Sequence, residues 1–356
     1  MVRMSPSRLS ALRLPLALTL GVALAAGSAM ARPKPPPPPP EYVPPPPPPP
    51  AGPVGLPDRI LADAAAYSAY LGRASATSPG FADAAAVAHA LRDGAAYEPK
   101  ALVRGAIAYA AIAALEDADF ISEIRAAGTT PDYRHAMAGY ILSNPAYVFL
   151  FKHSDGAAGL AREALGGAGL KLYLAGKSVK IASFTIQHQG WSKQDVADRP
   201  GRLAAMESFA DSPMPSADEE VGPLQRAATG AAPLSITAPP AEPPYTPLVA
   251  RALQLAAIAA IGEAGNEAYD ALTALTEEDD TAACLHMAKL NFHQCLAVAK
   301  PNYEDVFCLG QHAMADTGSC LVKNAGMTLP ADDPPPPPTA PAPTPTPKKR
   351  VHHVRG

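Results

Sequence analysis

The chain has 356 residues, of which 17% are charged and 6% aromatic, and its formal net charge is −4. This acidic balance excludes nucleic acid as a partner, because phosphate backbones are bound by clustered lysine and arginine. The chain also contains 43 prolines, and more than half of them lie in two stretches, Pro33 to Pro53 and Pro334 to Pro347. These proline-rich stretches enclose a central part that is rich in alanine and leucine.

The first 31 residues have the pattern of a secretion signal. Three arginines precede the apolar run Leu14 to Ala26, namely Arg3, Arg8 and Arg13. Ala29-Met30-Ala31 then places small residues where a signal peptidase reads them, so we predict cleavage after Ala31. The apolar run is too short for a spanning helix, which needs about 20 residues. We therefore expect an exported protein of the periplasm or the extracellular space that is not an integral membrane protein.

The two proline-rich stretches are interpreted as a spacer over residues 32–56 and a tail over residues 329–356. Uninterrupted proline runs favour polyproline II, which suits a stiff solvated linker or a ligand for an aromatic groove. The tail carries four basic side chains on an otherwise acidic chain: Lys348, Lys349, Arg350 and Arg355. They suit an anionic envelope polymer or lipid surface, and the alternative is a solubilising end without a partner.

Between these stretches, apolar residues recur at intervals of three and four, which predicts an all-α, alanine-rich helical bundle. The densest apolar stretch, Ala106 to Leu115, is expected to be a buried core helix. The predicted helices cover residues 57–72, 80–93, 99–126, 132–143, 146–166, 170–187, 192–210, 248–275, 279–299 and 302–315. The breaks are expected at proline and glycine, including Gly166-Gly167.

A proline-rich and acidic stretch over residues 212–246 divides the helical part. It separates an expected helical domain, 57–211, from an expected disulfide-stapled helical domain, 247–328. The alternative is a single bundle with a long crossing loop, and the pattern does not decide between the two. Either part is long enough to own a core, although the smaller one would benefit from its cysteines.

The two helical parts resemble each other. Tyr97-x-Pro99 precedes Leu102-Val103-Arg104 and a run of alanine and isoleucine, and Tyr245-x-Pro247 precedes a closely similar run. Asn144-Pro145-Ala146-Tyr147 is likewise echoed by Lys300-Pro301-Asn302-Tyr303. This pattern predicts an internal duplication in which a long helix precedes a helical hairpin.

All four cysteines lie in the second of these hairpins. Cys284 and Cys295 are 11 residues apart, which places them on one helix face with a rise of about 16 Å between them. They cannot pair with each other, because a disulfide requires Cα atoms within roughly 7 Å. An antiparallel hairpin favours the nested pairs Cys295 with Cys308 and Cys284 with Cys320, and we expect the second helix to end at Asp316-Thr317-Gly318.

A metal site is the competing interpretation, because His286, His293 and His312 lie among the cysteines. Neither Cys284-x-His286 nor His293-x-Cys295 has the spacing of four that points two ligands the same way on a helix. An oxidising compartment also removes thiolates. We therefore expect disulfides, with no metal and no cofactor.

No catalytic motif stands out, so two classes of function are compared. The first is a non-enzymatic protein of the cell envelope, with a rigid helical body that interacts with another envelope protein or with an envelope surface. The second is a hydrolase or transferase for envelope material, with His188 or His153 in a cleft between the two halves. Further candidates for that site are His135, Asp132, Asp155, Asp195 and the segment Gln187-His188-Gln189-Gly190-Trp191. Convergence of these residues on one concavity would favour the enzyme, and their dispersal would favour the interaction protein.

Overall fold

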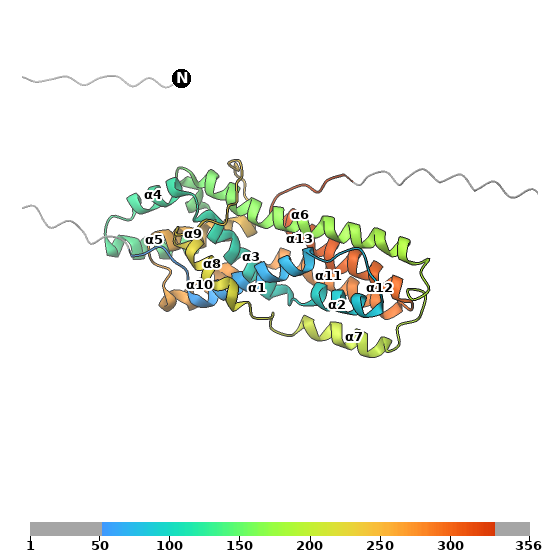
Figure 1. Cartoon of the computed structure of the whole chain (residues 1–356). Coiled ribbons are helices and arrows are strands. Elements are labelled where there is room, and N and C mark those ends of the chain that lie inside the picture. The colour runs from blue at the N-terminus through green and yellow to red at the C-terminus, as the bar shows by residue number, and fades with distance from the viewer. Residues whose placement is uncertain (1–51, 332–356) are drawn as a thin grey trace, which may run out of the picture. The chain divides into compact units, whose positions relative to one another are not determined.

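The part of the chain that the structure describes is built from helices alone. The computed structural model describes residues 52–331, and this range contains no strand (Figure 1). The predicted all-α class is confirmed for this range. The predicted signal peptide with its cleavage site at Ala31, nearly all of the spacer and most of the basic tail lie outside the described residues.

The described chain contains α-helices, short 3-10 helices and one π-helix. The α-helices are α1 (Asp58–Ser75), α2 (Ala84–Ala95), α3 (Pro99–Ala114), α4 (Ala118–Ala127), α5 (Pro131–Ser143), α6 (Ser154–Ile186), α7 (Arg199–Glu207), α8 (Asp218–Ala228), α9 (Pro247–Ala260), α10 (Tyr269–Thr273), α11 (Asp279–Val298), α12 (Asn302–Cys308) and α13 (Thr317–Asn324). The 3-10 helices are η1 (Pro145–Leu150), η2 (Ser208–Ala210), η3 (Asn266–Ala268) and η4 (Ala274–Thr276), and the π-helix is η5 (Leu309–Asp316).

Helix α3 lies at the centre of the core and packs against α1, α6 and α9. Every residue from Ala106 to Leu115 is buried except Tyr109, which is half-buried, so the predicted core helix is confirmed. Both α3 and α9 begin with a proline, whose missing N–H would have no partner at that position anyway. The preceding residue caps each helix: the Glu98 carboxylate accepts from the Lys100 and Ala101 amides, and the Thr246 hydroxyl accepts from the Val249 amide.

The two predicted helical halves share one core. Helix α3 of the first half lies against α9 of the second, and α6 lies against η5 and α13. Within the stretch expected to be a linker, residues 218–228 form α8, which packs on α1. Leu224, Ala227 and Ala228 of α8 are buried there, so an amphipathic segment is present between the prolines.

The duplicated pattern matches the structure in one part only. The α3 and α9 motifs start in the same way, but the segments that follow differ. The second hairpin exists, because α11 packs on α12, η5 and α13. The first does not form, because α5 packs mainly on α9 and η1, whereas α6 packs mainly on η5, α13 and α3.

Three predicted helix boundaries are wrong for identifiable reasons. The helix expected over 99–126 is divided in two, because the Asp117 carboxylate caps α4 by accepting from the Phe120 amide. The helix expected over 248–275 ends at Ala260, because Gly262 adopts a φ of +80° just after it. The helix expected over 192–210 forms only from Arg199, where the Asp198 side chain caps α7.

The break expected at Gly166-Gly167 is also wrong, since α6 continues through it for 33 residues. Close packing explains why glycine is accommodated here. A Cβ on Gly166 would lie 2.0 Å from the Met327 sulfur, and a Cβ on Gly169 would lie 2.7 Å from the Leu321 Cβ. The glycines of α6 therefore mark a contact surface and not a helix end.

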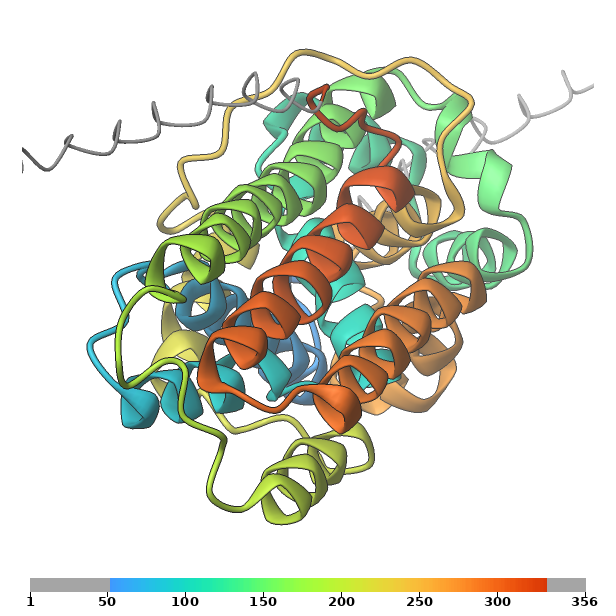
Figure 2. The ribbon, with the colours of Figure 1, turned by 90° about the vertical axis from the view of Figure 1, so that its right-hand side faces the viewer.

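Helix α6 and the rod formed by α12, η5 and α13 approach each other at two glycine pairs. Gly176 faces Gly310, and Gly169 faces Gly318, so the two elements run antiparallel. A Cβ on any of these four glycines would come within 3.0 Å of an atom of the opposite element. Figure 2 shows α6 in green, the rod in red and α11 in orange side by side.

Candidate functional site

The histidines proposed for the enzymatic alternative do not converge. His153 immediately precedes α6, and His188 follows its last residue by two positions. A helix of 33 residues is about 50 Å long, so these two side chains lie far apart. His135 is exposed on α5, where its Nδ1 lies 3.4 Å from the Glu263 carboxylate. Asp132, Asp155 and Asp195 are also exposed, so no site gathers this set.

The segment from Gln187 to Trp191, the polar and aromatic patch of the sequence, has a structural role. The Trp191 indole N–H donates to the Gln189 side chain at 2.6 Å. The loop that follows is tied to the start of α12, because the Asn302 side chain donates to the Gln194 carbonyl at 2.8 Å. These contacts fix the turn between α6 and the disulfide-bonded hairpin.

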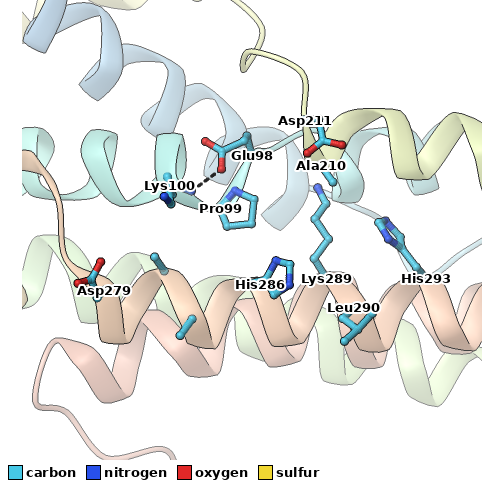
Figure 3. A pocket seen from close by; sticks show the side chains of 12 residues that line it. Glu98, Pro99, Lys100, Ala210, Asp211, Asp279, His286, Lys289, Leu290 and His293 are labelled. Carbon is cyan, nitrogen blue, oxygen red and sulfur yellow. Dashed lines mark hydrogen bonds between the residues drawn. The ribbon is translucent and has the colours of Figure 1, made fainter.

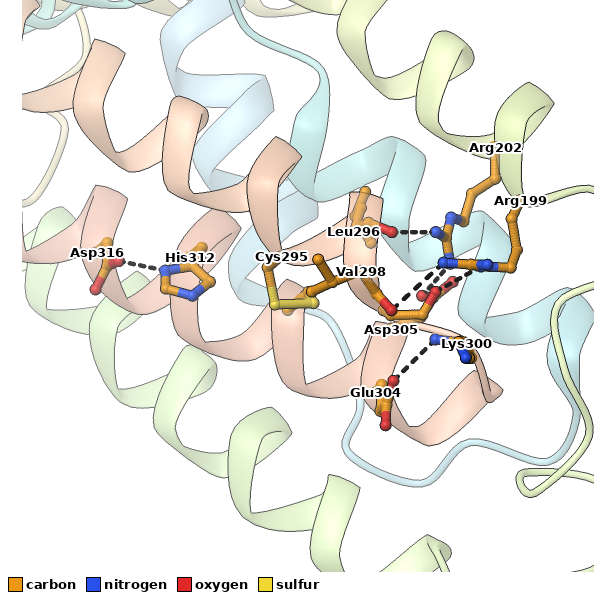
Figure 4. Close-up of a disulfide and its surroundings, with 12 residues drawn as sticks. Arg199, Arg202, Cys295, Leu296, Val298, Lys300, Glu304, Asp305, His312 and Asp316 are labelled. Carbon is orange, nitrogen blue, oxygen red and sulfur yellow. Dashed lines mark hydrogen bonds and ion pairs between the residues drawn. A yellow bond between two sulfur atoms is a disulfide. The ribbon is translucent and has the colours of Figure 1, made fainter.

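The cysteines form the nested pairs that the sequence predicted (Figure 4). Cys284 is bonded to Cys320 with a Cα–Cα distance of 5.8 Å, and Cys295 to Cys308 with a distance of 5.6 Å. Both distances lie in the usual range for disulfides. The expected helix end at Asp316 is wrong, because the chain continues from the π-helix η5 directly into α13. Both bonds therefore join α11 to a continuous helical rod.

Two arginines of α7 hold the C-terminal turn of α11. Arg199 donates to the carbonyls of Ala297 and Ala299 at 3.0 and 2.8 Å. The Arg202 guanidinium donates to the Leu296 carbonyl and pairs with the Asp305 carboxylate, and both side chains of this pair are buried (Figure 4). Cations stabilise the negative end of a helix, so α7 acts as a clamp on the hairpin.

The surroundings of Asp305 disfavour its charged form. Burial raises the pKa of this carboxyl to about 6, although hydrogen bonding and charge attraction from Arg202 act in the opposite direction. The charge of Asp305 at neutral pH therefore depends on its arginine partner.

The hairpin also forms one wall of a cavity of about 390 Å³, which we call the lysine cavity (Figure 3). Its walls come from α11, the start of α3 and the segment after α7. The side chains that carry charge or bind protons there are Glu98, Lys100, Asp211, Asp279, His286, Lys289 and His293. The sequence contained a signal for this site that the metal interpretation passed over, because residues 286, 289 and 293 lie at spacings of three and four on one helix face.

Lys289 is the most strongly perturbed base of the lysine cavity. Its side chain is 3% exposed, and its amine donates to the carbonyls of Ala95, at 2.7 Å, and Tyr97. The amine also lies 4.0 Å from the centroid of the Tyr97 ring. Burial lowers the pKa of Lys289 to about 7, and the nearby charges of Glu98 and Asp211 only partly oppose this effect.

A second, apolar concavity lies beside the Cys295–Cys308 bond. This groove of about 400 Å³ is lined by Phe184 of α6, by Val298 at the end of α11 and by Tyr303 and Phe307 of α12, and we call it the disulfide groove. The exposed fractions of Phe184 and Val298 are 54% and 74%, and Ile181, one turn earlier on α6, is 62% exposed. Large apolar side chains that gather at a surface in this way mark binding sites.

Other classes of site find no support in residues 52–331. No group of three or more histidine, cysteine, aspartate or glutamate side chains in this range is arranged to hold a metal ion. None of the described helices is both long and apolar enough to cross a membrane. Comparisons of the chain with protein-family models, with curated proteins and with solved structures gave no match.

Proposed function

We propose that the chain is an exported, non-enzymatic protein of the cell envelope that binds a partner protein through the disulfide groove. The single observation that carries the proposal is the exposure of Ile181, Phe184 and Val298 around a concavity with aromatic walls. Burial of such side chains is favourable at about 25 cal/mol per Å² of apolar surface, so a partner that covers them gains affinity.

The groove is rigid, which also favours binding. The Cys295–Cys308 bond fixes α11 against α12, and the arginine clamp of α7 holds the last turn of α11. A preformed surface loses little conformational entropy when a partner binds. The dispersal of His135, His153 and His188 supports an interaction role over the enzymatic alternative.

The compartment part of the proposal rests on the two disulfides. Structural disulfides persist in oxidising compartments and are rare in reducing ones. Mature protein from its native compartment should therefore contain no free thiol and should begin at Arg32, as measured by thiol counting and N-terminal sequencing. Four free thiols, or a chain that retains its first 31 residues, would contradict export.

Photo-crosslinking in intact cells tests the binding surface. A photoreactive amino acid replaces Ile181 or Val298 in the full chain, and as a matched control it replaces Leu150, which is 79% exposed in η1. We expect one envelope protein to crosslink at both groove positions and not at Leu150, and we expect Phe184→Asp to weaken that crosslink. Equal crosslinking at all three positions, or crosslinks only between copies of this chain, would contradict the proposal.

Interaction of the basic tail with an anionic polymer or lipid surface remains a prediction. Lys348, Lys349, Arg350 and Arg355 lie outside the described residues, so no geometry bears on it. Such binding would weaken steeply with salt, because it rests on charge alone.

A further inference from the structure

The lysine cavity is a second site, which the proposed function does not use. It is built around His286, Lys289 and His293, on the face of α11 that points toward the start of α3 and the segment after α7 (Figure 3). The disulfide groove involves only the last turn of α11 and the elements beyond it. The two sites therefore differ in their residues as well as in their chemistry.

The hydrogen bonds of Lys289 suit a neutral amine. A neutral amine has two N–H groups and one lone pair. The carbonyls of Ala95 and Tyr97 accept two hydrogen bonds from the Lys289 nitrogen, which accounts for both N–H groups of the neutral form. The lone pair of that form remains available as a nucleophile. Because both acceptors belong to the backbone that leads into α3, the nitrogen is held in place at the cavity wall.

His293 lies one turn after Lys289 on the same face and supplies a group that moves protons. Its Nε2 is buried and makes no hydrogen bond within the described residues. Burial and the neighbouring charge of Lys289 lower the pKa of His293. A neutral imidazole with an unoccupied nitrogen beside an amine is the arrangement that general acid and base catalysis requires.

The remaining charged and titratable groups around the amine come from four elements. Glu98 and Lys100 stand at the start of α3, Asp211 follows η2, and Glu207 belongs to α7. Asp279 and His286 share α11 with Lys289, and Asp316 of η5 acts on the nearby Tyr97. The Glu98 carboxylate is occupied by two amides of α3. No carboxylate is recorded in a salt bridge with Lys289 among the described residues, in contrast to the pair of Arg202 and Asp305.

We propose that Lys289 is a carbonyl-reactive amine that captures a small aldehyde or ketone in the lysine cavity as an imine. The nitrogen lone pair attacks the carbonyl carbon, and His293 carries a proton from nitrogen to oxygen. The carbon–oxygen bond of this adduct then breaks, the oxygen leaves as water, and a carbon–nitrogen double bond forms. The step needs no oxidant or reductant, and water reverses it.

Reductive trapping on the full, disulfide-bonded chain tests the assignment. The protein is incubated at pH 7 with propanal or with glyoxylate, and sodium cyanoborohydride reduces any imine to a stable secondary amine. Peptide mass spectrometry then gives the labelling rate of each lysine. Lys100 on the rim of the same cavity and the exposed Lys171 and Lys323 are internal controls.

We expect Lys289 to be labelled at least tenfold faster than these controls by one or both aldehydes. At pH 7, an amine with a pKa of about 7 is about half neutral, whereas an ordinary lysine is neutral to roughly one part in 10³. Lower basicity and restricted access reduce this advantage but leave a clear margin. The labelling rate of Lys289 should also level off above pH 8, while the controls continue to accelerate.

Variants separate reactivity from folding. His293→Gln should slow the labelling of Lys289 about tenfold with an unchanged unfolding midpoint, and His135→Gln on α5 should leave the rate unchanged. The wild-type map keeps the proposal falsifiable if a variant does not fold. Labelling of Lys289 no faster than Lys100, or only after unfolding in urea, would show that the lysine merely pins the α2–α3 turn and would overturn the proposal.

Discussion

Replacement of Gly176 by alanine tests the close approach of α6 to η5. The new Cβ would lie 2.5 Å from the Ala315 nitrogen and 2.7 Å from the Gly310 oxygen. Both are backbone atoms, so the contact is relieved only if the two elements move apart. Overpacking of this kind costs about 1 to 3 kcal/mol, whereas alanine improves helix propensity by about 1 kcal/mol. Because backbone cannot rotate away, we expect a net loss of about 1 to 2 kcal/mol in the free energy of unfolding.

The matched control is Gly139→Ala. Gly139 is exposed inside α5, and a Cβ there would meet no atom within 4 Å. This variant should gain about 0.5 to 1 kcal/mol, since only the propensity term acts. Urea unfolding followed by circular dichroism at 222 nm, without reductant, measures both. If Gly176→Ala were as stable as Gly139→Ala, the helices would not be as close as the structure places them and the reasoning would fail.

Three further predictions concern charges and disulfides. Because the pKa of Lys289 is lowered to about 7, the unfolded chain binds more protons between pH 7 and 10.5, so this group adds stability as pH rises, by at most about 1.4 kcal/mol per unit. In urea titrations at pH 7 and 9, Lys289→Met should lose that rise, and an identical rise in both proteins would contradict the shift. Arg202→Met should lose about 3 kcal/mol by leaving Asp305 buried and uncompensated, while adding Asp305→Leu should restore most of it; no recovery in the double variant would refute the charge argument. Removal of the Cys295–Cys308 bond by two serines should lower the free energy of unfolding by about 3 kcal/mol in the chain-entropy description, and an unchanged midpoint would show that the hairpin holds without it.

The sequence predicted features that follow from local rules. Helical periodicity identified an all-α chain, and the spacing of Cys284 and Cys295 along one helix excluded their mutual bond and led to the nested pairs. Proline at the first helical position marked the starts of α3 and α9. Each of these inferences uses helix geometry alone and needs no knowledge of which helices meet.

Features that depend on packing between distant segments were missed. Gly166 and Gly167 were taken as a helix end because glycine lowers helix propensity, but tertiary contact with Met327 overrides that preference. The π-helix η5 leaves no mark in apolar periodicity. The lysine cavity depends on the α2–α3 turn meeting α11, almost 200 residues later, so only the spacing of His286, Lys289 and His293 was available beforehand.

The π-helix η5 has a consequence for how the chain tolerates insertions and deletions. Bonded or paired positions are 11 and 7 residues apart on α11 and α6, but their partners on the rod are 12 and 8 residues apart. The rod therefore carries one residue more than its neighbours over the same length, and the wider π turn, with hydrogen bonds from i to i+5, absorbs it. Deletion of one residue from η5 would turn everything after it by about 100° and swing Gly318 and Cys320 away from both partners at once. The reading frame of the rod is thus set in phase by a single extra residue, which two separate neighbours check.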